Sequence, residues 1–256
     1  MKPSPSSFGP NRPRTQSENG RRVRKNRSWI PYNPGLHKLI EAKQAGSEPL
    51  GDKAMDCGFR GWHQRGYLPH YDAPGVTQLV TMRLMDSLPL GRRGEWEMLF
   101  RIENNPERRR QLEAYLDRGL GECWLGQSAI AALADSALRF FNGKRYQLVA
   151  WVVMPNHLHL VLRIWDVPLL LLVKSWKSFI ARGANAILGR NGTFWERDYW
   201  DTLIKDEAHL LRAVRYVERN PTKAKLVLEP REWRWSSARF RDEFGVLRMP
   251  GGYPRS

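Results

Sequence analysis

The sequence predicts an α+β fold built from two strand–helix–strand units that share one antiparallel sheet. Three observations support this fold class. Hydrophobic residues alternate along the chain between the two-residue period of strands and the longer period of helices. The stretch WVVMPNHLHLVL (151–162) joins two apolar strands through a Pro–Asn turn. With 256 residues, of which 41% are hydrophobic, the chain can bury the core of one main domain.

The first half of the predicted domain contains one strand and two helical stretches. The segment VTQLVTMRL (76–84) has the composition of a strand. Helical spacing follows over 92–116, where Pro106 is expected to break or kink the helix. Ser128 is expected to cap the next helix, which covers 129–141.

The second half supplies the hairpin and the last helices. We expect strands at 145–154 and 157–164, a helix at 168–188, a strand at 194–204 and a helix at 206–220. Pro168 begins the first of these helices, and Pro221 is expected to end the last. This order predicts a ferredoxin-like βαββαβ core, in which helices cover one face of an antiparallel sheet, followed by one more helix.

Composition divides the chain into a basic arm (1–55), a folded domain (56–240) and a C-terminal tail (241–256). The beginning of the arm is rich in Pro, Ser, Asn and Arg and has little to bury, so we expect the arm to be disordered or loosely tethered. Its run RRVRKNR (21–27) either follows a phosphate backbone or only adds solubilising charge, and the sequence does not decide between the two.

The charge of the chain indicates a polyanionic partner. Lys and Arg number 42 against 26 Asp and Glu, which gives a net charge of +16. Nucleic acid is favoured over membrane, because no amphipathic anchor is evident and LLLLVKSWKSFI (169–180) is too short and too charged to span a bilayer. The two cysteines, Cys57 and Cys123, form no CxxC pair, which argues against a zinc ribbon or disulfide framework and suits a reducing cytosol.

Two histidines in the predicted hairpin are candidate metal ligands. Side chains alternate along a strand, so His157 and His159 share one face while Leu158, Leu160 and Leu162 share the other. Imidazoles two residues apart can converge on one divalent ion. A pair of hydrogen-bonded surface histidines gives the same pattern, and the pattern alone favours that alternative.

A tyrosine and an asparagine in the last predicted helix are candidates for the same site. Tyr216 and Asn220 are four residues apart, so they lie on one side of the helix. A free phenol has a pKa near 10 and needs a nearby cation to become a nucleophile. The alternative is an interior aromatic residue that packs on Val217 or Leu211.

Six further residues are candidate DNA contacts. Three lie in the glycine-flanked segment GFRGWHQRG, which is expected to be a loop that clamps a backbone or bases: Arg60, His63 and Arg65. Three lie on the polar side of the helix at 168–188, where a merely solvated face is the alternative: Lys174, Lys177 and Arg182.

Three other residues are weighed and set aside. Tyr199 is a rival nucleophile, but no ligand-type residue lies at a matching spacing, and we interpret it as structural or facing DNA. His70 and His209 have no evident partners in the sequence and are left out of the metal site.

Taken together, the motifs resemble the single-tyrosine HUH transposases of bacterial insertion sequences, and most closely the REP-associated tyrosine transposases. The matching stretches follow the order of that family and cover nearly everything after residue 60: GWHQRGYLPHYD (61–72), VTMRLMDSLP (80–89), LDRGLGECWL (116–125), WVVMPNHLHLVL (151–162), SWKSF (175–179), FWERDYWD (194–201), YVERNPTKAKLV (216–227) and WRWSSA (233–238). Lys225 departs from the family pattern, which has a small residue or glycine there.

The resemblance implies a specific chemistry. A divalent Mg or Mn ion would be held by His157 and His159, with Asn220 at the position of a third ligand. Tyr216 would attack a phosphate of single-stranded or hairpin DNA at palindromic repeats, giving a 5′-phosphotyrosine and a free 3′-hydroxyl. We expect a cytoplasmic, nucleoid-associated bacterial protein, and the sequence leaves open whether it is a monomer or a homodimer. A non-catalytic protein that binds hairpin DNA or RNA on the same fold remains the alternative, and a hydrolase of small substrates suits so basic a chain poorly.

Overall fold

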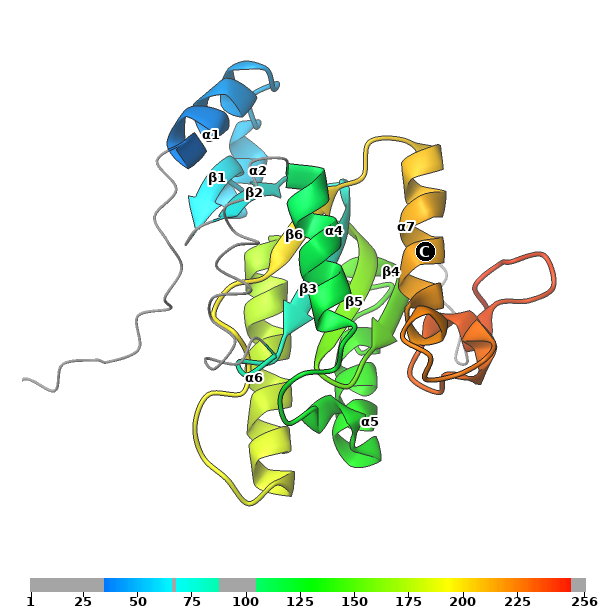
Figure 1. Cartoon of the computed structure of the whole chain (residues 1–256). Coiled ribbons are helices and arrows are strands. Elements are labelled where there is room, and N and C mark those ends of the chain that lie inside the picture. Colours follow the sequence, from blue (N-terminus) through cyan, green and yellow to red (C-terminus); the bar gives the residue numbers. More distant parts are fainter. Residues whose placement is uncertain (1–34, 66–67, 88–104, 250–256) are drawn as a thin grey trace, which may run out of the picture.

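A four-stranded antiparallel sheet forms the centre of the molecule (Figure 1). The computed structural model describes residues 35–65, 68–87 and 105–249. The sheet contains β3 (Thr77–Arg83), β4 (Tyr146–Val153), β5 (His157–Ile164) and β6 (Trp200–Leu203), in the spatial order β4-β5-β3-β6. The first strands of the two βαβ units, β3 and β5, therefore pair in the middle, and the second strands lie at the edges. This is the predicted ferredoxin-like core, and the prediction is confirmed.

Each βαβ unit contributes one helix to the same face of the sheet. These helices are α5 (Ser128–Arg139) and α6 (Leu169–Ile187), which pack against each other. The even-numbered leucines of β5 point into the core beneath them: Leu158, Leu160 and Leu162 are all fully buried there. The hydrophobic side of the hairpin thus packs against α5 and α6, and its other side faces the helices on the opposite face of the sheet.

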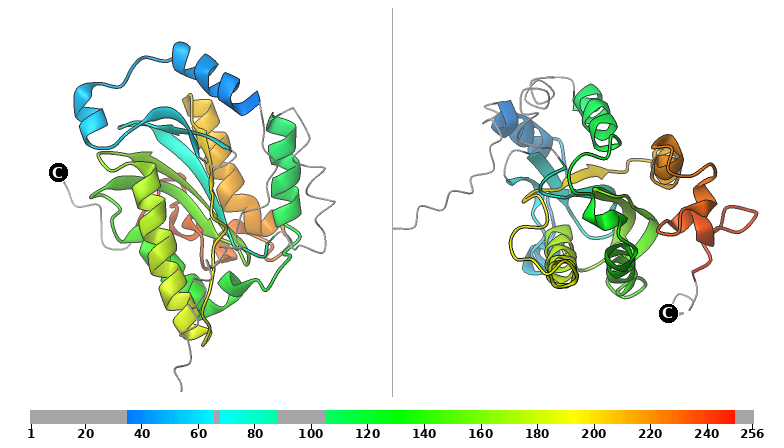
Figure 2. Two further views of the ribbon diagram at one scale, coloured as in Figure 1. Left: turned by 90° about the vertical axis from the view of Figure 1, so that its left-hand side faces the viewer. Right: turned by 60° about the horizontal axis from the view of Figure 1, so that its bottom comes forward.

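The opposite face of the sheet carries α7 (Glu207–Lys223) and α4 (Asn105–Leu116), as the two views of Figure 2 show. Ala213 and Val217 of α7 pack on Val152 and Val161 of the hairpin. The C-terminal part of α4 covers β6 through a small cluster of Leu112, Leu116 and Trp200. The odd-numbered face of β5, which carries the two histidines, therefore looks toward α7.

The helix boundaries differ from the predictions most clearly in α5, α4 and α7. Gln127 occupies the N-cap of α5 and makes no side-chain cap bond, so Ser128 is the first helical residue and not the cap. Pro106 falls in the first turn of α4, where its missing N–H removes no helical bond, and the part of that predicted helix before residue 105 lies outside the described residues. Helix α7 continues through Pro221 to Lys223 instead of ending before the proline.

The end of α7 is formed by a residue in the left-handed conformation. Lys225 has φ +58°, and the amide of Leu226 donates to the carbonyl of Pro221 at 2.9 Å. Glycine adopts this conformation most easily, which gives a physical reason for the small residue that the sequence resemblance places here.

The residues before the sheet fold onto its β6 side. Helices α1 (Gly35–Ala45) and α2 (Asp52–Asp56) precede a two-stranded hairpin of β1 (Gly61–Arg65) and β2 (Leu68–Asp72). Gln44 of α1 donates to the carbonyl of Trp62 at 2.7 Å, and Ile40 is buried. The prediction of a disordered arm over 1–55 is therefore wrong for 35–55, and residues 1–34 lie outside the described residues. The predicted loop around Arg60–Arg65 is largely a strand.

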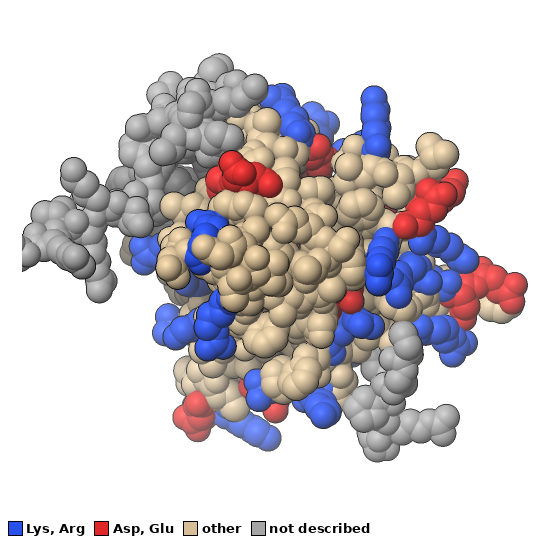
Figure 3. Space-filling view, turned by 90° about the horizontal axis from the view of Figure 1, so that it is seen from below, with Lys and Arg blue, Asp and Glu red and all other residues tan. Residues whose placement is uncertain are grey.

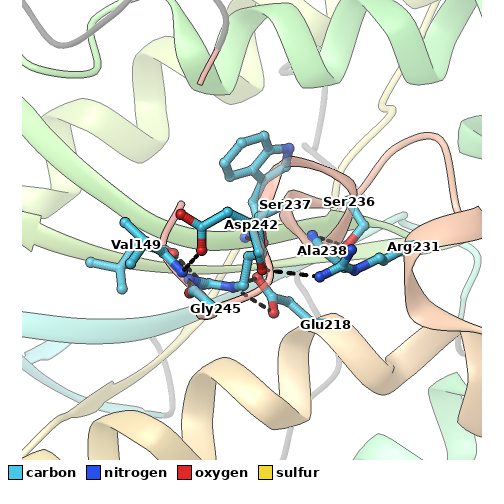
Figure 4. Close-up of polar contacts among 11 residues, drawn as sticks. Val149, Glu218, Arg231, Ser236, Ser237, Ala238, Asp242 and Gly245 are labelled. Carbon is cyan, nitrogen blue, oxygen red and sulfur yellow. Dashed lines mark hydrogen bonds and ion pairs between the residues drawn. The ribbon is translucent and has the colours of Figure 1, made fainter. Parts of the chain in front are cut away.

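The C-terminal segment covers the edge strand β4. It contains two short 3-10 helices, η3 (Pro230–Glu232) and η4 (Ser237–Phe240). The amide of Val153 donates to the carbonyl of Trp235 at 2.8 Å, so β4 is not left with an open edge. Arg241 donates to Glu218 of α7 at 2.7 Å and to the carbonyl of Val149 at 2.9 Å (Figure 4). The boundary predicted at residue 240 is thus not a structural break.

Candidate active site

The hairpin histidines and the α7 tyrosine meet on one face of the sheet. Tyr216 Oη lies 3.1 Å from His159 Nε2, and the two rings pack edge to face with centroids 5.2 Å apart. His157 and His159 also contact each other, with ring centroids 4.7 Å apart. The face shared by the two imidazoles is therefore the face that the phenol approaches.

The neighbouring strand orients His159. Thr81 of β3 lies directly opposite His159 in the register of the sheet, and its Oγ1 is 2.8 Å from His159 Nδ1. Both side chains are buried. This contact fixes the ring plane so that Nε2 is the nitrogen that faces Tyr216.

The turn residue Asn156 determines which nitrogen of His157 can bind a cation. Its side-chain amide donates to the carbonyls of Leu116 and Leu120 at 3.2 and 3.1 Å, so its Oδ1 must point the other way. That oxygen lies 2.7 Å from His157 Nδ1, which must therefore carry the proton and donate. The lone pair of His157 is consequently on Nε2, an atom that is buried and has no hydrogen-bond partner among the described residues.

Asn220 has the same unusual property. Its side chain is fully buried, and neither Oδ1 nor Nδ2 has a hydrogen-bond partner among the described residues. A buried amide with both groups unsatisfied costs free energy unless something else binds it. Asn220 lies one turn beyond Tyr216 on α7, on the same side of the helix.

These donors fit a divalent ion. Neutral imidazole nitrogens and an amide oxygen are accepted ligand types for Mn²⁺, and Mg²⁺ favours the oxygen. Burial lowers the pKa of His157 to about 3, with a smaller contribution from the charge of Lys223, so this ring is neutral. The described residues contain no group of three or more His, Cys, Asp or Glu suited to a metal.

Four basic residues surround Tyr216 that the sequence predictions did not include. Together with the tyrosine they line a shallow hollow on α7: Arg212, Arg215, Arg219 and Lys223. Lys223 forms an ion pair of 2.7 Å with Asp117, just beyond the end of α4. The signal was present in HLLRAVRYVERNPTK, because positions three, four and seven apart share one helix face.

The α6 candidates lie apart from this site. Lys174 and Arg182 are exposed on α6, which packs on the face of the sheet opposite to α7 (Figure 2). Lys177 is half-buried, and its ammonium group donates to the carbonyls of Glu196 and Asp198 at 2.8 and 2.7 Å. Burial lowers the pKa of Lys177 to about 7. Its contacts are those of a residue that joins α6 to the segment before β6.

The candidates around β1 also lie apart from Tyr216. Arg60 is exposed, and the guanidinium of Arg65 lies over the ring of Tyr199 at 5.9 Å. His63 is half-buried, and its Nδ1 lies 3.0 Å from the carbonyl of Gly61. Tyr199 itself is buried in the main core, which agrees with the structural interpretation of this residue.

His70, which was expected to lack partners, lies in a buried polar cluster. Its Nδ1 pairs with the carboxylate of Asp201, its Nε2 is 3.6 Å from Asp198, and its ring packs on Tyr199 at 4.7 Å. Burial disfavours the charged ring, but the two carboxylates outweigh it and raise the pKa of His70 to about 9. Sequence reasoning missed this cluster because Asp201 is 131 residues away in the chain.

Fold and site together define an α+β protein whose central hairpin carries two adjacent imidazoles, one of which contacts a phenol on α7. No family model matches the sequence, and no curated protein matches it. One similar solved structure is a REP-associated tyrosine transposase bound to a REP hairpin, with 17% identity, coverage of 76% of this chain and 94% of that one, and a TM-score of 0.44. Another is a putative transposase from Deinococcus radiodurans R1, with 15% identity, coverage of 62% and 96%, and a TM-score of 0.26. No helix among the described residues is long and apolar enough to cross a membrane.

Proposed function

We propose that this chain is a transposase that cleaves and rejoins single-stranded DNA at hairpin sites, with Tyr216 as the nucleophile and a divalent metal as cofactor. The observation that carries the proposal is the placement of Tyr216 Oη at 3.1 Å from His159 Nε2. Buried side-chain atoms of His157 and Asn220 that have no hydrogen-bond partner among the described residues support it. A helix aromatic with only a packing role does not need its hydroxyl within hydrogen-bond distance of an oriented, buried imidazole.

The metal-binding residues are His157, His159 and Asn220. A bound Mg²⁺ or Mn²⁺ would neutralise the non-bridging oxygens of the phosphate and stabilise the charge that develops there. Asn156 and Thr81 support this role, since each holds one imidazole by the nitrogen that does not face the site.

The reaction is a transesterification. Tyr216 Oη forms a bond to phosphorus and loses its proton, while the bond from phosphorus to the 3′ oxygen breaks and that oxygen takes up a proton. The products are a 5′-phosphotyrosine and a free 3′-hydroxyl. Attack by a 3′-hydroxyl on the phosphotyrosine reverses these bond changes and rejoins a strand. The number of phosphoester bonds is conserved, so neither ATP nor water is consumed, and the main task of the protein is orientation.

A covalent adduct tests the proposal. The probe is a single-stranded hairpin oligonucleotide from inverted repeats beside the gene, labelled at its 3′ end because the 5′-phosphotyrosine keeps that fragment on the protein. With Mn²⁺ we expect a labelled protein band that resists denaturation, absent with EDTA and absent in Tyr216→Phe. The matched control is Tyr71→Phe, a tyrosine of the β1–β2 hairpin.

Two outcomes contradict the proposal in different ways. An adduct of undiminished yield in Tyr216→Phe removes this residue from the role of nucleophile. Binding that survives EDTA, with no cleavage under Mg²⁺ or Mn²⁺, favours the alternative of a non-catalytic protein that binds hairpin DNA or RNA.

A further inference from the structure

We propose that Arg212, Arg215 and Arg219 form a phosphate-binding track on α7, which holds the single strand next to the phosphate that Tyr216 attacks. The identity of the strand rests on the proposed function, whereas the track itself rests on the geometry and charge of α7. These three residues are called the α7 arginines below.

The α7 arginines and Tyr216 share one surface. They line the same hollow, which is built from residues of α7 alone. With a rise of 1.5 Å per residue, Arg212 and Arg219 are roughly 10 Å apart along the helix axis, and Tyr216 lies between them. A strand that follows this face therefore passes Tyr216.

The charge of the α7 arginines is not neutralised by the rest of the described chain. All three are exposed, and none has an ion pair or side-chain hydrogen bond among the described residues. Lys223 in the same hollow differs, because Asp117 pairs with it at 2.7 Å. Glu218, which lies between Arg215 and Arg219 in the sequence, points to the other side of the helix. There Ser237 donates to it at 2.6 Å and Arg241 at 2.7 Å (Figure 4).

The same arrangement makes α7 a fixed support. Its inner face is tied down by Ala213 and Val217 in the core and by the Glu218–Arg241 ion pair. Guanidinium groups on a rigid helix lose less freedom on binding than groups on a loop, and each can bind a phosphate with two parallel hydrogen bonds. A row of exposed arginines that are unpaired among the described residues, beside a candidate nucleophile for phosphate, thus fits a phosphodiester backbone better than it fits a solvated surface.

Positive charge elsewhere on the molecule provides a control. Seen from below, Lys and Arg side chains ring the molecule and gather on the side of the C-terminal segment, while the middle of this face is mostly uncharged (Figure 3). Three exposed arginines of that segment match the α7 arginines in number and charge: Arg231, Arg234 and Arg239. Each makes a contact within its own segment, with Asp242, Trp235 and Arg234 respectively.

The experiment measures binding without cleavage. Affinity for an unstructured thirty-residue oligothymidylate is determined as a function of salt in EDTA, with Tyr216→Phe as the parent protein. Replacing the α7 arginines with alanine is expected to weaken binding about tenfold or more at low salt. The log-log salt slope should fall by about 2, because each phosphate that the protein no longer neutralises accounts for about 0.7. Replacing Arg231, Arg234 and Arg239 is expected to leave the slope nearly unchanged. Melting temperatures of both triple variants equal to that of the Tyr216→Phe parent show that each variant is folded.

An unchanged slope in the α7 variant overturns the proposal, as does an equal loss of affinity in the C-terminal control, which would indicate general charge attraction. Equal weakening of binding to a duplex of the same length overturns the assignment to a single strand. No step of the binding assay needs catalysis. If no covalent adduct forms, the binding result for the α7 arginines still stands. If the α7 arginines do not contribute to binding, the proposed role of Tyr216 still stands.

Discussion

Tyr216 Oη lies 3.1 Å from His159 Nε2, within hydrogen-bond distance. This nitrogen is the one through which His159 would bind a metal ion. The other ring nitrogen of His159 is held by Thr81 at 2.8 Å and is not available. In the proposed site the phenol and the ion therefore compete for the same nitrogen, His159 Nε2. The contact keeps Tyr216 oriented before an ion binds, and ion binding would replace it.

This competition gives a prediction about metal affinity. Tyr216→Phe removes the hydroxyl that holds His159 Nε2, so we expect the variant to bind Mn²⁺ more tightly than the wild type, by roughly 2- to 10-fold, the equivalent of one net hydrogen bond. Isothermal titration calorimetry without DNA measures it directly. His159→Ala should abolish Mn²⁺ binding both in the wild type and in Tyr216→Phe. Weaker binding by the phenylalanine variant would mean that the phenol is a ligand instead of a competitor.

A second prediction concerns the residue that orients His159. Thr81→Val keeps the shape of a fully enclosed side chain but removes the oxygen that lies beside Nδ1. We expect Mn²⁺ affinity to fall about 10- to 100-fold, as is typical when the outer partner of a metal-binding histidine is removed. Thr77→Val, at the start of the same strand, is the matched control. Equal affinities in the two variants would show that Thr81 does not position the ring.

The core of the fold and the position of the site were readable from the sequence, because both depend on local patterns. The alternation in WVVMPNHLHLVL fixes the faces of the hairpin, and the spacing of Tyr216 and Asn220 fixes one side of α7. These patterns place His159 and Tyr216 on inward faces of adjacent elements, which is where the structure has them.

Features that depend on distant partners could not be read in this way. Lys177 has the sequence context of a surface lysine, but carbonyl groups 19 and 21 residues further along the chain enclose its amine. His70 meets Asp201 only because the β1–β2 hairpin folds against β6. The hairpin itself was missed because the glycines around Arg60 and His63 are typical of a loop.

A third prediction follows from the hydrogen bonds of Lys177. Lys177→Met keeps much of the apolar stem but removes the donor to the carbonyls of Glu196 and Asp198. Leaving such groups unpaired is expected to lower the free energy of unfolding by about 1–3 kcal/mol. Urea denaturation measures this change, and Lys174→Met on the exposed side of the same helix should change it by less than about 0.5 kcal/mol. A stable Lys177→Met variant with weakened DNA binding would instead support the predicted phosphate contact.

The last prediction is a pH dependence that originates at His70. Its pKa is raised from 6.5 to about 9, so the folded state holds a proton that the unfolded chain has released. The stability that this provides is fully present below pH 6.5 and is lost as the pH rises through 9. Lys177 acts in the opposite direction, because its pKa is lowered to about 7 from 10.5, so the pH profile of the wild type alone does not isolate His70.

The comparison of the wild type with His70→Gln does isolate His70, since Lys177 is common to both proteins. We expect the difference in unfolding free energy between them to shrink steadily between pH 6.5 and 9, as measured by urea denaturation at each pH. A difference that stays constant over this range would show that His70 is neutral in the folded protein and that Asp198 and Asp201 do not hold its proton.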